Sequence, residues 1–451
     1  MKPENRGNAY SSRSVRPEIR AAVFGVGRVG ATIAAAWLRY GAHVTLVDVD
    51  QERIKCILSS KELFANEPGV DNAILDGVKR GKCTATSNTA QGASGCDCIF
   101  IAVPAGLKDG KVDLSAVKKA ASDIGRSISK GAFVSLETSV PPGTTRNIVA
   151  REIEDVSGLK AGESFYVSYS PERISEGRAL QDLEENYEKV VSGINETSLD
   201  IASQFYSKIA KKGVIRMSSL EAAEAEKLFE GIYRDVNIAL ANELASYCES
   251  FNLDFWEIRS AANSQPHCYL HKPGLGVGGA CIPVYPWFVI NQAEEIGNVL
   301  ELVKTARRVN DQQPSKVLGA VVKAIRPGEK VAVLGLAFRG DVDDDRFSPS
   351  YTVINELEHR SAELWVHDDF VNESSNHNFK LTSDLEAAVR GAKLVIVATD
   401  HSEYKTLSFM DIARIAAPDA IIIDARGVLK RPDRLRRNWH VIGVGNRVVE
   451  D

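Results

Sequence analysis

Short apolar runs recur along the chain in two groups, and segments of helix or loop length separate the runs. The runs are rich in β-branched residues and are almost continuously apolar, which is typical of parallel strands buried on both faces. Their alternation with helical segments predicts a doubly wound α/β domain at each end of the chain. The predicted strands are 21–25, 43–48, 97–104, 132–138 and 165–170 in the first group, and 330–335, 363–368, 393–399, 420–425 and 441–444 in the second.

The middle of the chain has a helical pattern instead. Ser218 followed by Glu221 is a capping-box signature, and from there to Phe251 the sequence has no Pro and a single Gly. A helix of about 33 residues is roughly 50 Å long, which is too long for a small domain. We therefore predict that it spans between the two domains or packs across a dimer, and two shorter helices are the alternative. Its predicted apolar stripe consists of Leu220, Leu228, Ile232, Val236 and Leu240.

Length, composition and charge narrow the classes of protein. The 451 residues favour about three domains, and 44% hydrophobic with 25% charged residues are typical of a globular protein. The net charge of −5 and the lack of a Lys/Arg-rich run argue against nucleic-acid binding. No apolar stretch approaches the ~18 to 20 residues of a membrane span, so we expect no membrane partner. Residues 1–18 are polar and predict a loose tail, not a signal peptide.

The first predicted strand leads into a glycine motif. Gly25, Gly27 and Gly30 form G-x-G-x-x-G, a helix with Val29 on its apolar face follows, and the next strand ends in Asp48. Such glycines allow a tight turn and close approach of a pyrophosphate at a helix N-terminus. Asp48 is suited to accept hydrogen bonds from a ribose diol and to repel a 2′-phosphate, which favours NAD over NADP. The alternative is an α/β turn without a ligand.

The corresponding turn near the C-terminus is different. The segment VAVLGLAFRGD contains Gly335 but no G-x-G-x-x-G motif. A second dinucleotide is therefore less expected than another ligand, such as a nucleotide diphosphate held with the help of Arg339. A structural lobe without any ligand is the alternative.

One of the cysteines lies in an unusual loop. The seven cysteines have no paired spacing, which argues against a disulfide framework and favours a cytoplasmic protein. In KPGLGVGGACIPVYPW, four glycines precede Cys281 and prolines flank the segment, so the loop is expected to expose the thiol. A dinucleotide domain combined with a nucleophilic cysteine indicates oxidation of an alcohol or aldehyde through a thioester.

Several longer motifs occur in a fixed order along the chain. They are GVGRVG, ETSVPPGTT, SPERISEGRAL, EAEKLFEGIYRDVNIALANELA, GVGGACIP, VLGLAFRGDVDDDRFSPSY and IIIDARGVL. Together these motifs resemble the nucleotide-sugar 6-dehydrogenases, the UDP-glucose/GDP-mannose dehydrogenase family, over about residues 19–445. The variants SPER and YRDVNIALANE are more similar to the UDP-N-acetylmannosamine and N-acetylhexosamine dehydrogenase branch than to the UDP-glucose branch.

The resemblance implies an architecture and a reaction. The fold is α/β, with two Rossmann-like doubly wound parallel-sheet domains joined by a long central helix that forms a homodimer. The implied reaction oxidises C6 of a UDP-linked sugar from alcohol to carboxylate with two NAD, through a cysteine thiohemiacetal and a thioester. The implied parts are a tail (1–18), an NAD-binding domain (19–215), a central helical domain with the cysteine loop (216–312) and a UDP-sugar-binding domain (313–451).

The resemblance also assigns residues by position. Cys281 is the nucleophile, Lys227 stabilises negative charge on the C6 oxygen, and Glu172 and Glu176 handle water and protons, with Ser139 nearby. No metal site is implied. The cofactor residues are Gly25, Gly27, Arg28, Val29, Gly30, Asp48, Val103, Pro104, Ser139 and Arg346. The substrate residues are Glu172, Arg173, Lys227, Gly231, His267, Gly276, Gly278, Tyr285, Arg339 and Arg426.

The chain departs from the family pattern within this substrate site. Gly231 replaces an Asn, Tyr285 an Asp, His267 an Arg, Ala280 a His and Arg339 a Lys. A phenol is uncharged at pH 7, so Tyr285 cannot pair with Lys227 as a carboxylate could. One hypothesis is a dehydrogenase for a differently shaped nucleotide sugar, in which Glu172 activates water. The other is partial, altered or lost activity.

The sequence leaves two alternatives to a nucleotide-sugar dehydrogenase. A β-hydroxyacid-type dehydrogenase shares a Rossmann domain and a long helix, but the second α/β domain and the Cys281 loop argue against it. A regulatory protein that binds NAD and a nucleotide sugar without turnover is the other alternative, and Gly231 and Tyr285 are the residues that favour it.

Overall fold

The computed structural model describes residues 18–59, 61–64, 66–319, 321–372, 378–433 and 435–445. The chain forms two compact units. The first unit contains Met1–Ala105 and Asp113–Lys227, and the second contains Gly106–Val112 and Leu228–Asp451. The predicted tail, residues 1–18, lies outside the described residues except for Glu18. Among the described residues, no helix combines the length and apolarity of a membrane span.

The first unit contains a six-stranded sheet in the order β3-β2-β1-β4-β7-β8, with all neighbours parallel. Counted along the chain, this order is 3-2-1-4-5-6, the arrangement of dinucleotide-binding domains. β3 was not predicted, because only one of its four residues is buried and it lacks an apolar run. The strands are β1 (Arg20–Phe24), β2 (His43–Val47), β3 (Cys83–Thr86), β4 (Cys98–Ile101), β7 (Phe133–Leu136) and β8 (Tyr166–Tyr169).

Helices bury both faces of this sheet. Trp37 of α1 is fully buried with Phe100 and Phe133 on one face, whereas Ile124 of α4 and Ile153 of α5 belong to the cluster on the other face. The helices are α1 (Arg28–Tyr40), α2 (Gln51–Leu58), α3 (Val70–Lys79), α4 (Ser115–Gly125), α5 (Arg151–Ser157), α6 (Ala179–Gln181) and α7 (Glu196–Tyr206). Shorter segments of this unit are η1 (Thr89–Gln91), η2 (Thr145–Ala150), η3 (Asp182–Asn186) and the strand pair β9 (Lys189–Val191) with β10 (Val214–Arg216). Another strand pair, β5 (Gly106–Lys108) with β6 (Lys111–Asp113), falls almost entirely in the segment Gly106–Val112 of the second unit.

The second unit contains another six-stranded parallel sheet, in the order β13-β12-β11-β14-β15-β16. This is again the order 3-2-1-4-5-6, so the two predicted α/β domains are confirmed. The prediction of the last strand at 441–444 was wrong, because Trp439 pairs with Ile422 and the chain turns at Gly443, where φ is +77°. The strands are β11 (Lys330–Leu334), β12 (Glu363–His367), β13 (Lys380–Thr382), β14 (Leu394–Val397), β15 (Ile421–Asp424) and β16 (Trp439–Val441).

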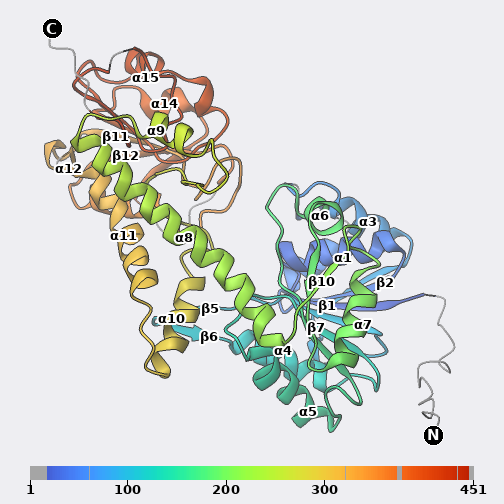
Figure 1. The fold of residues 1–451 in the computed structure, drawn as a ribbon. Helices are drawn as coiled ribbons and strands as arrows, with labels where there is room; N and C mark the ends of the chain where they lie inside the picture. The colour runs from blue at the N-terminus through green and yellow to red at the C-terminus, as the bar shows by residue number, and fades with distance from the viewer. Residues whose placement is uncertain are drawn as a thin grey trace, which may run out of the picture. The chain divides into compact units, whose positions relative to one another are not determined.

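The long helix α8 (Leu220–Ser250) is continuous over 31 residues, so the alternative of two shorter helices is wrong (Figure 1). Its cap is Ser219 and not Ser218, since Ser219 Oγ accepts the Ala222 N–H at 3.1 Å. The remaining helices are α9 (Phe255–Ala262), α10 (Tyr285–Glu295), α11 (Glu301–Leu318), α12 (Val321–Ala324), α13 (Pro349–Glu358), α14 (Leu385–Val389) and α15 (Phe409–Ile415), with the 3₁₀ turn η4 (Tyr404–Thr406).

The predicted apolar stripe of α8 is only partly correct. Leu220 and Leu228 are buried, but Leu240 is 42% exposed. The buried positions of the second half are small or polar, and Asp235 among them accepts a hydrogen bond from Arg307 of α11 at 2.5 Å. A pattern of apolar residues misses this face, because an ion pair and close backbone packing bury it.

Candidate nucleotide and catalytic sites

The turn between β1 and α1 has the glycine geometry of a phosphate cradle. Gly25 has φ +91°, and a Cβ there would lie 2.6 Å from the Ala102 carbonyl oxygen. A Cβ on Gly30 would collide with the Gly25 carbonyl oxygen, whereas a Cβ on Gly27 would meet nothing within 4 Å. The fold therefore requires Gly25 and Gly30, and Gly27 leaves open space in front of α1 for a ligand.

The polar groups around this turn fit NAD. Gly27 is the N-cap of α1 and makes no side-chain capping bond, so the first amides of the helix face this space. At the end of β2, Asp48 accepts the Val26 N–H at 2.7 Å and the Asp50 N–H at 3.0 Å. These bonds fix the carboxylate beside the turn, where it is suited to accept ribose hydroxyls.

The other predicted cofactor residues of the first unit follow neighbouring strands. Val103 and Pro104 follow β4, and Ser139 follows β7, which pairs with β4. Thr138 Oγ1 donates to the Val103 carbonyl oxygen at 2.6 Å and joins the two segments. They lie at the carboxyl edge where the strand order reverses, which is the expected ligand crevice of an open α/β sheet.

Glu176 lies at the same turn. Its carboxylate forms an ion pair with Arg28, the first residue of α1. The loop that carries it is fixed by buried Glu67, which accepts the N–H groups of Gly177 at 3.1 Å and Ala179 at 3.2 Å. The structure thus brings Glu176 to the glycine turn. Glu67 had no sequence signal, because its role depends on two distant backbone amides.

Glu172 lies in the loop after β8. The residue is partly exposed, but protein encloses its carboxyl group. Burial raises the pKa of Glu172 to about 7, and the positive charges of Lys227 and Lys189 act in the opposite direction. A carboxylate with this pKa is half ionised near neutral pH, which suits a general base for water. In the first unit, the charge of Lys227 therefore acts on the Glu172 carboxyl group.

A buried ion pair that no sequence motif indicated supports the Glu172 loop. Lys189 Nζ lies 2.8 Å from Glu137 Oε2 and donates to the Pro171 carbonyl oxygen at 2.8 Å. Both side chains are buried, and Tyr206 also donates to Glu137. Since Pro171 precedes Glu172, the ammonium fixes the backbone next to the candidate base.

A second buried carboxyl group fixes the start of α8. Glu224 accepts hydrogen bonds from Gly143 N at 2.5 Å, Thr145 N at 2.7 Å and Thr145 Oγ1 at 2.6 Å. Burial raises the pKa of Glu224 to about 7, although these three bonds oppose the rise. Glu224 precedes Lys227 by one helical turn, so it ties the lysine's helix to the PPGTT segment.

In the second unit, the glycine loop exposes Cys281 as predicted. All seven cysteines are described and none forms a disulfide, and Cys281 is the exposed one. Gly279 has φ +87°, and a Cβ there would lie 2.9 Å from the Phe338 ring. A Cβ on Gly278 would lie 2.8 Å from the Phe347 carbonyl oxygen. Gly279 N also donates to the Arg346 carbonyl oxygen at 2.8 Å, so the missing side chains let the loop pack on the turn after β11.

Gly231 and Tyr285, two of the five residues predicted to depart from the family pattern, contact each other. A Cβ on Gly231 of α8 would lie 2.9 Å from Tyr285 Cδ2. Tyr285 is the first residue of α10, and its hydroxyl donates to Cys281 Sγ at 3.1 Å.

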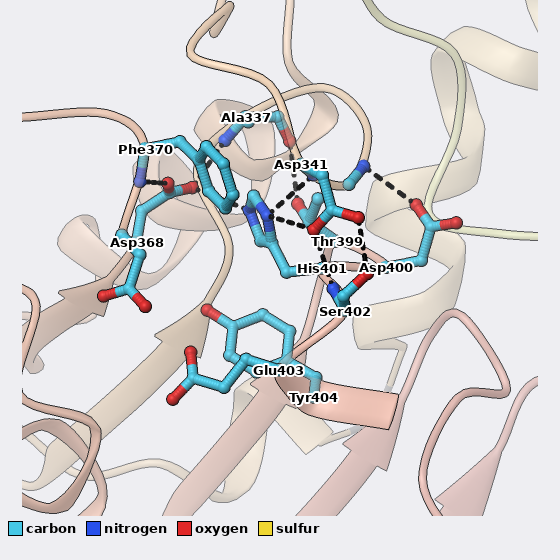
Figure 2. Close-up of polar contacts among 12 residues, drawn as sticks. Ala337, Asp341, Asp368, Phe370, Thr399, Asp400, His401, Ser402, Glu403 and Tyr404 are labelled. Carbon is cyan, nitrogen blue, oxygen red and sulfur yellow. Dashed lines mark hydrogen bonds and ion pairs between the residues drawn. The ribbon is translucent and has the colours of Figure 1, made fainter. Parts of the chain in front are cut away.

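The carboxyl edge of the second sheet repeats one feature of the first. Asp368, after β12, accepts the N–H groups of Leu336 at 2.7 Å and Ala337 at 3.0 Å, as Asp48 accepts that of Val26. Here His401 Nε2 also lies 3.1 Å from Asp368 Oδ2 (Figure 2). Although burial alone raises it, the hydrogen bonds from His401 and the amides lower the pKa of Asp368 to about 2.

His401 lies at this edge of the second sheet and is held by further contacts. Its ring stacks on Phe370 with centroids 5.0 Å apart, and its Nδ1 accepts the Asp341 N–H at 3.0 Å (Figure 2). The carboxylate that binds a ribose in a dinucleotide domain is thus engaged by a side chain. This agrees with the interpretation that the second domain has a different ligand.

The predicted cations of the second unit lie around the same turns. Arg426 Nη2 binds Asp400 Oδ1 at 3.0 Å, and its guanidinium lies against Gly274 of the cysteine loop. Arg339 follows Phe338, on which the loop packs, and stacks on its ring. Arg346 binds Asp344 with two nitrogens, and His267 is exposed in the segment after α9.

Comparison with known proteins decides the family. Residues 19–210, 221–312 and 332–431 match, respectively, the NAD-binding, central and UDP-binding domains of the UDP-glucose/GDP-mannose dehydrogenase family. The chain belongs to this family. The match confirms the prediction of an NAD-dependent nucleotide-sugar dehydrogenase and supports it over a binding protein without turnover.

The dehydrogenase is similar to several characterised relatives. The UDP-N-acetyl-D-mannosamine dehydrogenase of Pyrococcus horikoshii is 33% identical over 420 residues, which cover 92% of this chain and 97% of the relative. The enzyme of the same name from Campylobacter jejuni is 32% identical and covers 85% of this chain and 96% of the relative.

Solved structures support the fold. The P. horikoshii structure has a TM-score of 0.85 at 32% identity and covers 94% of this chain and 99% of its own. A UDP-glucose dehydrogenase of Pyrobaculum islandicum has a TM-score of 0.84 at 25% identity and covers 96% and 99%.

Proposed function

We propose that the dehydrogenase oxidises C6 of a UDP-N-acetylhexosamine from alcohol to carboxylate. The observation that carries this proposal is the exposed Cys281 thiol, presented by a glycine loop that packs on the nucleotide-binding domain. The relatives named above and the SPER motif favour an N-acetylated sugar, and UDP-N-acetylmannosamine is the first candidate.

The reaction needs two hydride transfers. NAD held at the glycine turn after β1 would supply the hydride acceptor for C6, and the side chains of the chain handle the charges and protons. Loss of hydride and proton from the alcohol gives an aldehyde, and the Cys281 thiolate adds to it to give a thiohemiacetal. A second hydride loss leaves a thioester, which water hydrolyses to the acid. Overall, one alcohol, one water and two NAD⁺ give one carboxylate, two NADH and three protons.

The first unit supplies the groups for charge and proton transfer. Lys227 is proposed to stabilise the negative charge that develops on the C6 oxygen, because a positioned cation acts strongly in a closed site. Glu172, with a pKa of about 7, is proposed to deprotonate the hydrolytic water. Glu176 is proposed to act beside the cofactor turn through its ion pair with Arg28. Ser139 lies at the same sheet edge.

The second unit supplies the nucleotide cations. Arg339 and Arg426 are proposed to bind the UDP diphosphate, since a guanidinium matches the geometry of phosphate oxygens. Arg426 is held by Asp400 and lies against the cysteine loop. Nucleotide binding and the position of the nucleophile are therefore expected to be coupled.

We also propose that the dehydrogenase acts as a homodimer in the cytoplasm. One face of α8, continued by the residue that follows it, exposes large apolar side chains at spacings of four and seven residues, an arrangement typical of a helix covered by a partner. Seven free cysteines fit a reducing compartment. The exposed set, which we call the α8 stripe, consists of Phe229, Tyr233, Leu240, Tyr247 and Phe251, at 57%, 53%, 42%, 55% and 61% exposure.

The proposed substrate class can be tested with a mixture of nucleotide sugars and NAD. Mass spectrometry of the mixture should show a UDP-N-acetylhexosamine converted to its acid. The Cys281→Ala variant should form no acid, and Cys56→Ala, which changes another partly accessible cysteine, should behave as the wild type. Tight binding of a nucleotide sugar without any converted product would contradict the proposal.

A further inference from the structure

We propose that Tyr285 is a positioning residue for the nucleophile: its hydroxyl stabilises the Cys281 thiolate, and Gly231 is glycine so that its ring can reach that place. The inference rests on the proposed role of Cys281 and adds to it the pair Tyr285 and Gly231. Both members replace polar residues of the family pattern, so the two departures form one altered structural unit.

The contact is built into the start of α10. Cys281 precedes Tyr285 by four residues, and the Cys281 carbonyl oxygen accepts the N–H groups of Tyr285 at 2.9 Å and Val284 at 3.1 Å. This turn places both side chains on one side, and the Tyr285 hydroxyl lies 3.1 Å from Cys281 Sγ. The backbone of the nucleophile and the phenol are therefore fixed to each other.

Packing determines where the ring lies. Gly231 offers only its backbone to the ring, since a Cβ there would lie 2.9 Å from Tyr285 Cδ2 and 3.4 Å from Tyr285 Cβ. The buried Phe288 ring lies one turn along α10, with the two ring centroids 6.1 Å apart. Glycine inside a helix is less favourable than alanine. Contact with the ring gives a physical reason for this unfavourable residue.

The chemistry follows from the charge of the two side chains. A phenol is neutral at pH 7 and donates a hydrogen bond, which favours the charged form of its acceptor. A carboxylate at the same position would repel a thiolate. When the Cys281 thiolate adds to the aldehyde, the S–C6 bond forms as the carbonyl π pair moves to oxygen. The hydrogen bond therefore acts before this step, by increasing the fraction of reactive thiolate.

Charged groups lie near this loop from two elements of the second unit. The turn that packs on it carries Arg339, Asp344 and Arg346, and Arg346 is paired with Asp344. Arg426, after β15, lies against Gly274 of the loop and is paired with Asp400. A test of Tyr285 must leave these residues unchanged.

The test measures the rate at which iodoacetamide alkylates Cys281 as a function of pH, with the site identified by peptide mass spectrometry. In Tyr285→Phe, which keeps the ring, the midpoint of the profile should rise by about one pH unit, and alkylation at pH 7 should fall about tenfold. Tyr40→Phe, an exposed tyrosine of the first unit, should keep the wild-type profile. An unchanged profile in Tyr285→Phe would overturn the inference.

The Gly231→Ala variant tests the contact between Gly231 and the Tyr285 ring. Displacement of the ring should shift the profile in the same direction, and adding Gly231→Ala to Tyr285→Phe should shift it little further. Additive shifts would contradict the shared mechanism. The alkylation profile is measured without any sugar. If no nucleotide sugar reacts, the proposed function is contradicted, but the alkylation profile still tests the role of Tyr285. In turnover, Tyr285→Phe should lower kcat with little change in KM and release aldehyde that hydrazine traps.

Discussion

Replacement of Lys189 by methionine should strongly destabilise the first unit. The ammonium and its partner Glu137 are both buried and lie 2.8 Å apart. Methionine fills similar space but removes the charge that balances the buried Glu137 carboxylate, which keeps the hydroxyl donors Ser135 and Tyr206. The Pro171 carbonyl oxygen also loses the hydrogen bond from the Lys189 ammonium. Removal of one partner of a buried ion pair costs about 3–5 kcal/mol. For a domain of this size, that lowers the melting temperature by roughly 6–20 °C.

The assay is thermal unfolding followed with and without NAD. NAD should raise the transition of the unit that binds it, which identifies the first unit in the melting curve. Lys211→Met is the matched control, because its ion pair with Glu185 is exposed, and it should leave the melting temperature almost unchanged. The double variant Lys189→Met/Glu137→Gln should recover part of the loss. A Lys189→Met melting temperature within about 2 °C of that of the control would refute the reasoning.

The same substitution should alter the pH dependence of turnover. The positive charge of Lys189 lowers the pKa of Glu172, so its loss should raise that pKa above the value of about 7. A base must be deprotonated to act, and the acid limb of the kcat profile should therefore move to higher pH. An unmoved acid limb in a folded variant would show that Glu172 is not the base.

Three further predictions concern the nucleotide edges and α8. Gly27→Ala should weaken NAD binding with little loss of stability, whereas Gly30→Ala should destabilise the first unit; isothermal titration and thermal melting separate the two effects. The pKa of Asp368 is lowered from 3.8 to about 2, so it contributes about 2 kcal/mol of stability above pH 4 that is lost as the pH falls from 4 to 2; urea unfolding of Asp368→Asn should lack this dependence. Tyr233→Glu combined with Tyr247→Glu should give monomers in analytical ultracentrifugation, and an unchanged dimer would contradict the proposed interface.

The sequence predicted the parts of the fold that depend on local pattern. Nine of the ten predicted apolar runs correspond to strands, because buried parallel strands need continuous apolar residues. β3 and β13 were missed, since they are short edge strands with mixed residues, and β16 was displaced because the apolar residues 442 and 444 belong to a turn. The continuous α8 was predicted, but its buried face was not, because Asp235 is buried by an ion pair.

The candidate site was predictable where a motif carried it. The glycine turn, Asp48 and the exposed Cys281 follow from local spacing and loop composition. The supports of the site were not predictable, because Glu137 and Lys189 are 52 residues apart in sequence and meet only in the folded sheet. Gly231 and Tyr285 were recognised as departures one by one, but the contact between them is visible only in the structure.

The ratio of NADH formed to nucleotide sugar consumed tests the central claim most directly. We predict two NADH for each sugar in the wild type and in Cys56→Ala, and no acid product in Cys281→Ala. Two NADH for each sugar in Cys281→Ala would contradict oxidation through a Cys281 thioester.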